Sequence, residues 1–146
     1  MDVARAGGLT HDQLAAQLRQ AGLRATRPRL LVLGVLRERR GHFSADDVAS
    51  LLTAAGAPLR RGSVYNVLGS LVDRGLVTVA DAGPGRALYE AQNSWHHHFV
   101  CRRCGAILDV DCLVGEKPCL DARLAGARID EAQIVFRGLC PRCAPR

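Results

Sequence analysis

Apolar residues recur at helical spacing along the first half of the chain. From Ser63 onward they fall at positions i, i+3, i+4 and i+7, which marks one buried face of an α-helix. These residues are Val64, Val67, Leu68 and Leu71. Three earlier stretches, about residues 10–20, 26–36 and 44–52, show similar clustering, and each starts at a serine or threonine that can cap a helix. The pattern predicts four short helices, the last of which opens at Ser63 and ends at Gly75.

The spacing changes from helical to alternating after Gly75. Residues 76–80 (LVTVA) and 86–90 (RALYE) have the composition of two short strands, and the turn residues DAGPG lie between them. Four helices followed by a hairpin is the element order of a winged helix, in which the third and fourth helices form a helix-turn-helix. We therefore expect the fourth helix to enter the major groove of DNA.

The outer face of that helix carries side chains that can contact base edges. Its polar residues are Arg61, Ser63, Tyr65, Asn66 and Ser70. An arginine can pair with guanine, an asparagine with adenine, and a tyrosine ring can touch the methyl group of thymine. For each residue alone, an ordinary solvated side chain is an equally good interpretation. Arg24 and Arg27, near the start of the second helix, are expected to hold the DNA backbone or minor groove.

Composition and charge limit the class of protein. The 146 residues are 48% hydrophobic and 23% charged, which is typical of a globular protein. The sequence contains no apolar stretch long enough to span a membrane and no pattern of a secretion signal, so we expect a cytoplasmic protein with no membrane partner. Residues 1–75 hold eleven arginines against six acidic residues, and this cationic half favours contact with a polyanion such as DNA.

All six cysteines lie in the second half of the chain. Four of them form two Cys-x-x-Cys pairs, Cys101 with Cys104 and Cys140 with Cys143, separated by 35 residues. Each pair can present two thiolates to one metal ion from a tight turn, and two pairs complete a tetrahedral site of the structural zinc type. An iron–sulfur cluster uses the same ligands, and two disulfides would need an oxidising compartment, so both alternatives stay open.

Three consecutive histidines precede the first cysteine pair. In the strand-like segment WHHHFV, His96 and His98 point to one face and His97 points to the other. Two imidazoles on one face indicate a second metal site. The alternative is that the three histidines have structural roles.

These motifs together resemble the ferric uptake regulator (Fur) family over residues 9–143. The segments that carry the resemblance are GLRATRPR at 22–29, HFSADDV at 42–48, SVYNVL at 63–68 and the signature HxHxxCxxCG at 96–105. The tail, including the segments 109–120 and 130–143, is most similar to the FurA/CatR subgroup. Members of that subgroup regulate catalase-peroxidase genes and sense peroxide through iron.

The resemblance implies an α+β fold with two domains. These are an N-terminal winged helix-turn-helix DNA-binding domain over residues 1–91 and a small α/β dimerisation domain with the four-cysteine zinc site over residues 92–146. It also implies a regulatory metal site formed by His42, Glu90, His96, His98 and Asp109. Nitrogen and carboxylate ligands without a thiolate suit Fe²⁺ or Mn²⁺. The implied activity is that of a repressor rather than an enzyme, one that binds palindromic operator DNA as a homodimer and takes no small-molecule substrate.

The similarity to this subgroup also implies a response to peroxide. Asp109 occupies the position where peroxide-sensing relatives have Asp and most iron-sensing relatives have Glu. Oxidation of a ligand, His42 or His96, is then the expected trigger, and catalase-peroxidase or other oxidative-stress genes are the expected targets. An iron-responsive or zinc-responsive uptake regulator is the alternative within the family, although the segment from Gly83 to Glu90 lacks the cysteine that zinc sensors often carry there.

Two further pairs of residues have more than one interpretation. Cys112 and Cys119 can be buried small residues, a thiol-disulfide sensor or accessory metal ligands. The family resemblance also implies a third metal site, which some members carry and to which His97 and Glu116 correspond, but Gln133 stands where the last histidine ligand of that site is expected.

Overall fold

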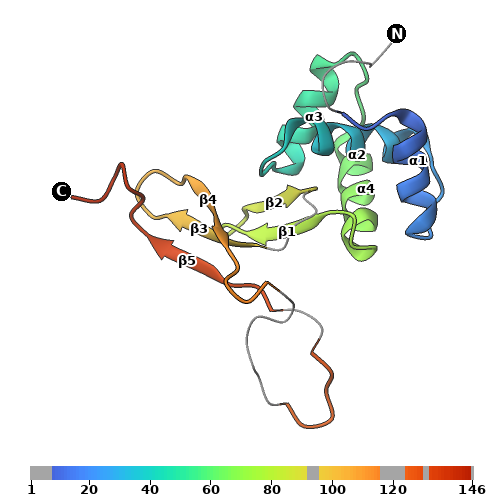
Figure 1. Cartoon of the computed structure of the whole chain (residues 1–146). Helices are drawn as coiled ribbons and strands as arrows, with labels where there is room; N and C mark the ends of the chain where they lie inside the picture. Colours follow the sequence, from blue (N-terminus) through green and yellow to red (C-terminus); the bar gives the residue numbers. More distant parts are fainter. Residues whose placement is uncertain (1–7, 92–95, 116–123, 130–131, 146) are drawn as a thin grey trace. The chain divides into compact units, whose positions relative to one another are not determined.

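The computed structural model describes residues 8–91, 96–115, 124–129 and 132–145 (Figure 1). The chain divides into two compact units, Met1–Gln92 and Asn93–Arg146. In the first unit the described elements are α1 (His11–Gln20), α2 (Arg27–Arg39), α3 (Ala45–Ala54), α4 (Arg61–Asp73), β1 (Thr78–Asp81) and β2 (Ala87–Glu90). In the second unit they are β3 (His96–Cys101), β4 (Ile107–Asp111) and β5 (Val135–Gly138). None of the described helices is long and apolar enough to cross a membrane.

Side-chain caps define where two of the four helices begin. Before α1, Thr10 Oγ1 accepts the Gln13 N–H while Gln13 Oε1 accepts the Thr10 N–H, so both helix-end donors have partners. Ser44 and Asp47 form the same reciprocal pair at the start of α3. Both helix starts are confirmed as the sequence predicted them.

The other two helices begin without a hydrogen bond from a capping side chain. Helix α2 follows Thr26 and has Pro28 in its first turn, where the missing N–H of proline costs no helical hydrogen bond. Helix α4 follows Arg60 and so begins two residues earlier than predicted. The N–H of Val64 already bonds to the carbonyl of Arg60, which places Ser63 inside the helix.

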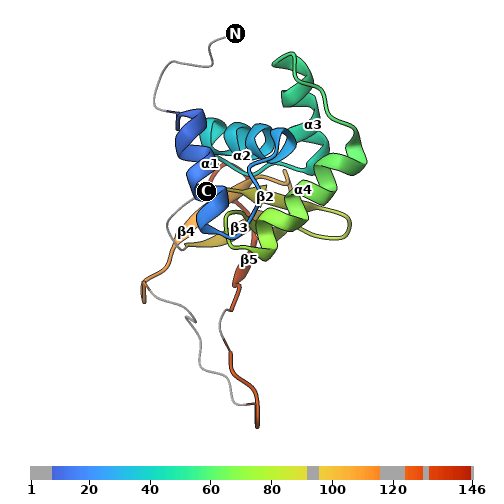
Figure 2. The same cartoon turned by 90° about the vertical axis from the view of Figure 1, so that its right-hand side faces the viewer.

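The apolar faces of the four helices meet in one core. Helix α2 lies between α1 and α3 and also packs against α4 (Figures 1 and 2). The largest fully buried apolar side chains of this unit are Leu18, Leu33, Leu36, Leu52, Leu68 and Leu71. The four residues predicted for the buried face of the fourth helix all belong to the core. The core thus fixes α4 by its apolar face and leaves its polar face outward.

A hairpin follows the helices, as predicted. Strands β1 and β2 are antiparallel, with Thr78 opposite Glu90. Gly83 and Gly85 in the connecting turn have φ angles of +127° and +70°, which residues with a side chain rarely adopt. Four helices followed by this hairpin give the first unit the element order of a winged helix.

The second unit is built on a three-stranded sheet with β3 in the centre. Strand β4 pairs with β3 in antiparallel orientation and β5 pairs with it in parallel orientation. One face of the sheet carries Phe99 with its cross-strand neighbours Leu108 and Phe136, whereas the opposite face carries His96 and His98. The chain is α+β as predicted, and among the described residues all helices belong to the first unit.

Candidate metal centres and nucleic-acid interface

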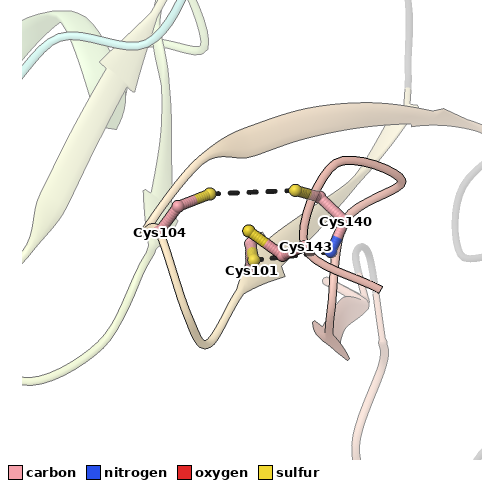
Figure 3. A group of neighbouring side chains, drawn as sticks. All are labelled: Cys101, Cys104, Cys140 and Cys143. Atoms are coloured by element: carbon pink, nitrogen blue, oxygen red, sulfur yellow. Dashed lines mark hydrogen bonds between the residues drawn. The ribbon is translucent and has the colours of Figure 1, made fainter. Parts of the chain in front are cut away.

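Four cysteine side chains converge in the second unit (Figure 3). Cys101 ends β3 and Cys104 lies in the turn that follows, while Cys140 and Cys143 lie in the turn after β5. The parallel pairing of β3 with β5 sets Cys101 beside Gly138 and so brings the two pairs together. All four sulfur atoms lie within 4.8 Å of one another, and those of Cys104 and Cys140 are 3.8 Å apart. Four sulfurs on a tetrahedral zinc ion are about 3.8 Å apart, so the cluster fits zinc.

Backbone N–H groups prepare two of these sulfurs to bind a metal. Hydrogen bonds from the backbone of Cys104 and of Cys140 lower the pKa of the Cys101 thiol to about 6. The Cys140 N–H lies 3.4 Å from that sulfur. A hydrogen bond with Cys140 raises the pKa of the Cys143 thiol to about 12. Burial alone would raise the pKa of the Cys140 thiol, but hydrogen bonds from the backbone of Arg142 and Cys143 act in the opposite direction and lower it. Two of the four thiols would therefore lose a proton readily on binding a metal, whereas Cys143 would keep its proton longer.

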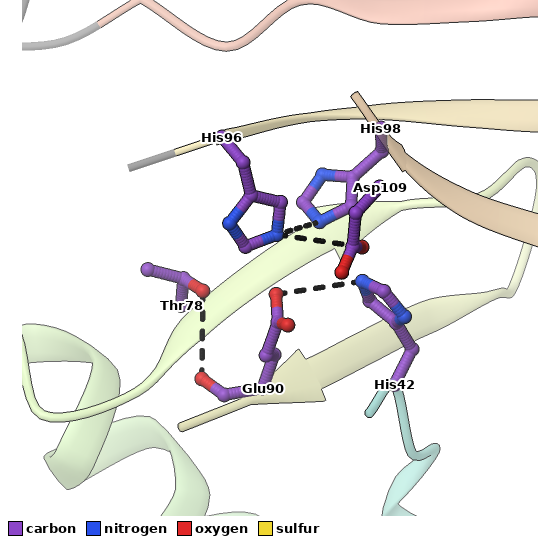
Figure 4. A network of polar contacts seen from close by, with 6 residues as sticks. All are labelled: His42, Thr78, Glu90, His96, His98 and Asp109. Atoms are coloured by element: carbon purple, nitrogen blue, oxygen red, sulfur yellow. Dashed lines mark hydrogen bonds and ion pairs between the residues drawn. The ribbon is translucent and has the colours of Figure 1, made fainter. Parts of the chain in front are cut away.

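Two donors of the implied regulatory site lie together in the first unit. An antiparallel bridge joins Phe43, in the connection between α2 and α3, to Tyr89 of β2 through two backbone hydrogen bonds of 3.0 and 2.8 Å. The bridge sets their chain neighbours His42 and Glu90 side by side, and His42 Nε2 lies 3.4 Å from Glu90 Oε2 (Figure 4). Glu90 is 1% exposed. A carboxylate so deeply buried needs a cation or hydrogen bonds to offset the loss of hydration.

Three more donors lie together on one face of the sheet in the second unit. His96 and His98 are two residues apart on β3, and Asp109 of β4 is the cross-strand partner of His98. The Nε2 atoms of the two histidines are 3.1 Å apart, and His96 Nε2 lies 3.5 Å from Asp109 Oδ1 (Figure 4). Two imidazole nitrogens and a carboxylate oxygen at this spacing form a harder donor set than four thiolates, suited to Fe²⁺ or Mn²⁺.

Two side chains that the sequence did not single out hold the end of the hairpin. Thr78 Oγ1 donates a hydrogen bond of 3.4 Å to the backbone carbonyl of Glu90 (Figure 4). Arg37 of α2 donates to the carbonyl of Ala91, and burial lowers the pKa of this arginine. The sequence did not indicate Thr78, because the predicted strands 76–80 and 86–90 would have set Leu76 opposite Glu90, whereas β1 begins at Thr78 and Thr78 faces Glu90.

Most residues predicted to contact DNA have exposed side chains. The exposed ones are Arg24, Arg27, Arg61, Tyr65 and Asn66. Ser63 is half-buried in the first turn of α4. Ser70, also predicted on the outer face, is half-buried and its hydroxyl donates to the carbonyl of Val67 at 2.8 Å, so the helix backbone already occupies it.

Comparison with known proteins identifies the family. The sequence model described as "Ferric uptake regulator family" matches residues 20–133. The chain belongs to this family. The transcriptional regulator FurA of Mycobacterium tuberculosis is 42% identical over 132 residues, which cover 89% of each chain. Ferric uptake regulation protein 1 of Mycolicibacterium fortuitum is 44% identical over 121 residues, which cover 82% of this chain and 74% of the relative.

A solved structure agrees with the assignment. The ferric uptake regulator of Pseudomonas aeruginosa, described with manganese, superposes with a TM-score of 0.69 at 29% identity, covering 88% of this chain and 98% of that one. The Fur family predicted from the motifs is confirmed. One relative is named a transcriptional regulator and the other a ferric uptake regulation protein, and these names agree with the expected class of regulator rather than enzyme.

The remaining candidates in this Fur-family chain fall partly outside the described residues. Cys112 is half-buried and its sulfur accepts the N–H of Gly115 at 3.3 Å, whereas Cys119 is not among the described residues. The buried ring of His97 lies 6.4 Å from that of Phe136, measured between centroids, and Glu116 is again outside the described part. The thiol pair and the third metal site therefore stay predictions.

Proposed function

We propose that this Fur-family chain is a metal-dependent transcriptional repressor that binds palindromic operator DNA as a homodimer in the cytoplasm. One observation carries the proposal: the chain has a four-thiol cluster within one unit and nitrogen and oxygen donors divided between both units. The four-thiol cluster suits a permanently bound structural metal ion. The nitrogen and oxygen donors suit a regulatory metal ion, because an ion bound by both units would link them.

Structural zinc is assigned to Cys101, Cys104, Cys140 and Cys143. Four soft thiolates close the coordination shell, so that no position is left for a substrate. The distances among the sulfur atoms and the acidic thiol of Cys101 support the assignment.

The regulatory ion, Fe²⁺ or Mn²⁺, is proposed to bind His42 and Glu90 together with His96, His98 and Asp109. The donor chemistry and the family resemblance support this set. Metal bound by ligands of both units restricts how the units are arranged, and in a dimer it restricts the separation of the two α4 helices. Recognition helices about 34 Å apart match DNA half-sites one helical turn apart. The metal favours DNA binding to the extent that it binds this arrangement better than others.

The apolar face of the sheet supports dimerisation through the second unit. Leu108 and Phe136, the cross-strand neighbours of Phe99, are 41% and 46% exposed. A second copy that covered this face would remove its apolar area from water, worth about 25 cal/mol per Å². Two-fold symmetry of the dimer would then match the symmetry of a palindromic operator.

Hydrogen peroxide is the proposed signal for release, and the proposed targets are catalase-peroxidase or other oxidative-stress genes. The short carboxylate of Asp109 supports this choice. Bound Fe²⁺ supplies the activation of peroxide. For each oxidised ring, at His42 or His96, the O–O bond of one peroxide breaks, one oxygen bonds to the ring carbon between the nitrogens, and the other leaves as water. The ring loses two electrons and the peroxide gains two. An oxidised ring is a weaker ligand, so the metal and then the DNA are released.

Metal content and DNA binding test the repressor proposal together. Purified protein should hold about one zinc per chain. It should bind a duplex selected from a random library by manganese-loaded protein, and this binding should require Mn²⁺ or Fe²⁺. His98→Ala should keep zinc yet weaken metal-dependent DNA binding by at least about tenfold. The control His11→Ala, at an exposed histidine of α1 outside both donor groups, should change neither. Equal binding of the selected duplex with and without Mn²⁺ would refute the proposal.

Mass spectrometry separates the possible triggers. Iron-loaded protein treated with about one equivalent of hydrogen peroxide should gain one oxygen on a peptide that carries His42 or His96, and manganese-loaded protein should not. A disulfide between Cys112 and Cys119 with unmodified histidines would instead identify a thiol sensor. Iron-loaded protein that stays unmodified and bound to DNA would identify an iron-responsive or zinc-responsive uptake regulator.

A further inference from the structure

An ion pair joins the two helices of the helix-turn-helix. Asp46 lies in the first turn of α3, and Arg61 is the first residue of α4. Arg61 Nε lies 2.9 Å from Asp46 Oδ1, and Arg61 Nη2 lies 3.2 Å from Asp46 Oδ2. Two parallel contacts make the pair bidentate, which orients a guanidinium more strictly than a single contact. The Arg61 and Asp46 side chains are 66% and 62% exposed, so the pair lies at the surface.

Two adjacent acidic residues at the start of α3 have different partners. Asp47 accepts hydrogen bonds from the backbone N–H and the hydroxyl of Ser44 and so completes the cap of its own helix. Asp46 contacts α4 instead. The positive end of α3 favours the charge of Asp46, and the capped helix fixes the position of its backbone. Asp46 therefore restricts the rotamers of Arg61, a side chain that would otherwise sample many of them.

The contact with Asp46 uses only one edge of the guanidinium. Nε–H and one N–H of Nη2 face Asp46, and the outer edge formed by Nη1 and the second N–H of Nη2 is not engaged by it. Guanine is recognised by two parallel N–H donors directed at O6 and N7, which is what this outer edge offers. The ring of Tyr65, one turn further along α4, has its centroid 5.6 Å from Arg61 Cζ and borders the guanidinium as well.

We propose that Asp46 is a positioning residue that directs Arg61 toward a base edge and away from the phosphates. The inference rests on the proposed binding of DNA by α4. An unrestrained arginine pairs with any phosphate and strengthens binding to every sequence. The carboxylate of Asp46 offsets the positive charge of Arg61 and binds the inner edge of its guanidinium. The outer edge of the guanidinium is thereby oriented for a base. Asp46 therefore raises the ratio of specific to non-specific binding rather than affinity in general.

The test compares two duplexes in the presence of Mn²⁺. One is selected from a random library by the manganese-loaded wild-type protein, and the other has the same base pairs in shuffled order. Asp46→Asn should lower the ratio of the two affinities by about tenfold, with the loss confined to one base pair in each half-site. On the shuffled duplex, the slope of log K against log salt should steepen by about 0.9 per protomer, because Arg61 can now pair with a phosphate.

Three further variants distinguish positioning from a simple change of charge. Asp73→Asn makes the same charge change at the exposed end of α4 and should leave the ratio as in the wild type. Asp46→Glu keeps the charge and should retain most of the discrimination. In an Arg61→Ala background, Asp46→Asn should have no further effect on the ratio, because Asp46 acts through Arg61.

The outcomes separate this inference from the proposed function. An unchanged ratio in Asp46→Asn, or a loss that persists in the Arg61→Ala background, would overturn the positioning role while DNA recognition stands. If the wild-type protein selects no sequence from the library, the proposed function itself fails and the inference falls with it. Thermal unfolding of each variant at the wild-type temperature would show that the comparison is between folded proteins.

Discussion

The two units of the chain are stabilised by different means. In the first unit, leucines and valines from all four helices form a buried core. Among the described residues of the second unit, only His97, Val100, Cys101 and Cys140 are buried, and two of these are cysteines of the candidate zinc site. A small sheet that buries so little apolar surface needs a metal, a cross-link or a second copy of the chain to stay folded. Hydrophobic burial thus holds the first unit, and zinc is expected to hold the second.

This difference separates stability from regulation. The four thiols lie within one unit, so the loss of zinc should remove the support of that unit. The nitrogen and oxygen donors form one group in each unit, and each group sits on backbone pairing that needs no metal, such as the bridge between Phe43 and Tyr89. Loss of the regulatory ion should therefore leave both units folded. A reversible signal requires this second kind of site.

The largest expected effect is the loss of the second unit in Cys104→Ser. Structural zinc contributes an apparent 10–16 kcal/mol in small zinc-dependent peptides, about the whole stability of a small domain. Zinc should fall from about one per chain to near none, and the dimer should be lost with it, whereas the helical circular dichroism of the first unit should persist. Metal analysis and light scattering check this. Native size with stoichiometric zinc would show that the cysteines are not the ligands.

A substitution in the helical core should have the opposite effect on the two units, destabilising the first unit and leaving the second unit unchanged. Leu33 is fully buried in α2, which packs against α1, α3 and α4. Leu33→Ala should destabilise the first unit by about 2–5 kcal/mol, through lost burial and the cavity left behind. Denaturation followed by helical circular dichroism measures the loss, and zinc content should stay at the wild-type value. Loss of zinc together with the helices would show that the two units do not fold separately.

Features that depend on a few consecutive residues were predicted from the sequence more successfully than contacts between residues far apart in the chain. The caps at Thr10 and Ser44 and the turn after β1 each depend on a few consecutive residues, and all were predicted. The convergence of the two cysteine pairs was also predictable, because four thiols at that spacing have few other uses. The first residue of α4 was placed at Ser63 instead of Arg61, two residues late, because a serine is common at a helix start and nothing in the sequence favoured Arg61.

Contacts between separate helices and strands could not be predicted from the sequence. The ion pair between Asp46 and Arg61 joins residues 15 positions apart. Each of them has an ordinary explanation alone, as an acid at a helix start and a basic residue on a polar face. Only the packing of α3 against α4 brings them together. The donors Glu90 and His42 were found through a family resemblance, because neither stands in a motif that indicates metal binding by itself.

Variants of Asn66 in α4 and Arg27 in α2 should distinguish contacts with DNA bases from contacts with the DNA backbone. Asn66→Ala should weaken binding to the selected duplex by about 1–3 kcal/mol and relax the preference at one base pair, with little effect on a shuffled duplex. Arg27→Ala, at the first position of α2, should weaken binding to both duplexes and reduce the salt slope by about 1. Fluorescence anisotropy over a range of salt measures both. An equal loss on the two duplexes for Asn66→Ala would exclude a base contact there.

The smallest effect should come from the helix caps of the first unit. Ser44 accepts a hydrogen bond from the Asp47 N–H at 3.0 Å, so Ser44→Ala should cost about 1 kcal/mol and lower the unfolding temperature by about 4–8 °C. Thr26 also precedes a helix but makes no capping hydrogen bond with its side chain, so Thr26→Ala should change stability by no more than about 0.5 kcal/mol. Both values come from thermal unfolding of the helical signal, with zinc content as the check that the second unit is untouched. Equal losses in the two variants would mean that the hydroxyl of Ser44 does not stabilise α3 through its hydrogen bond.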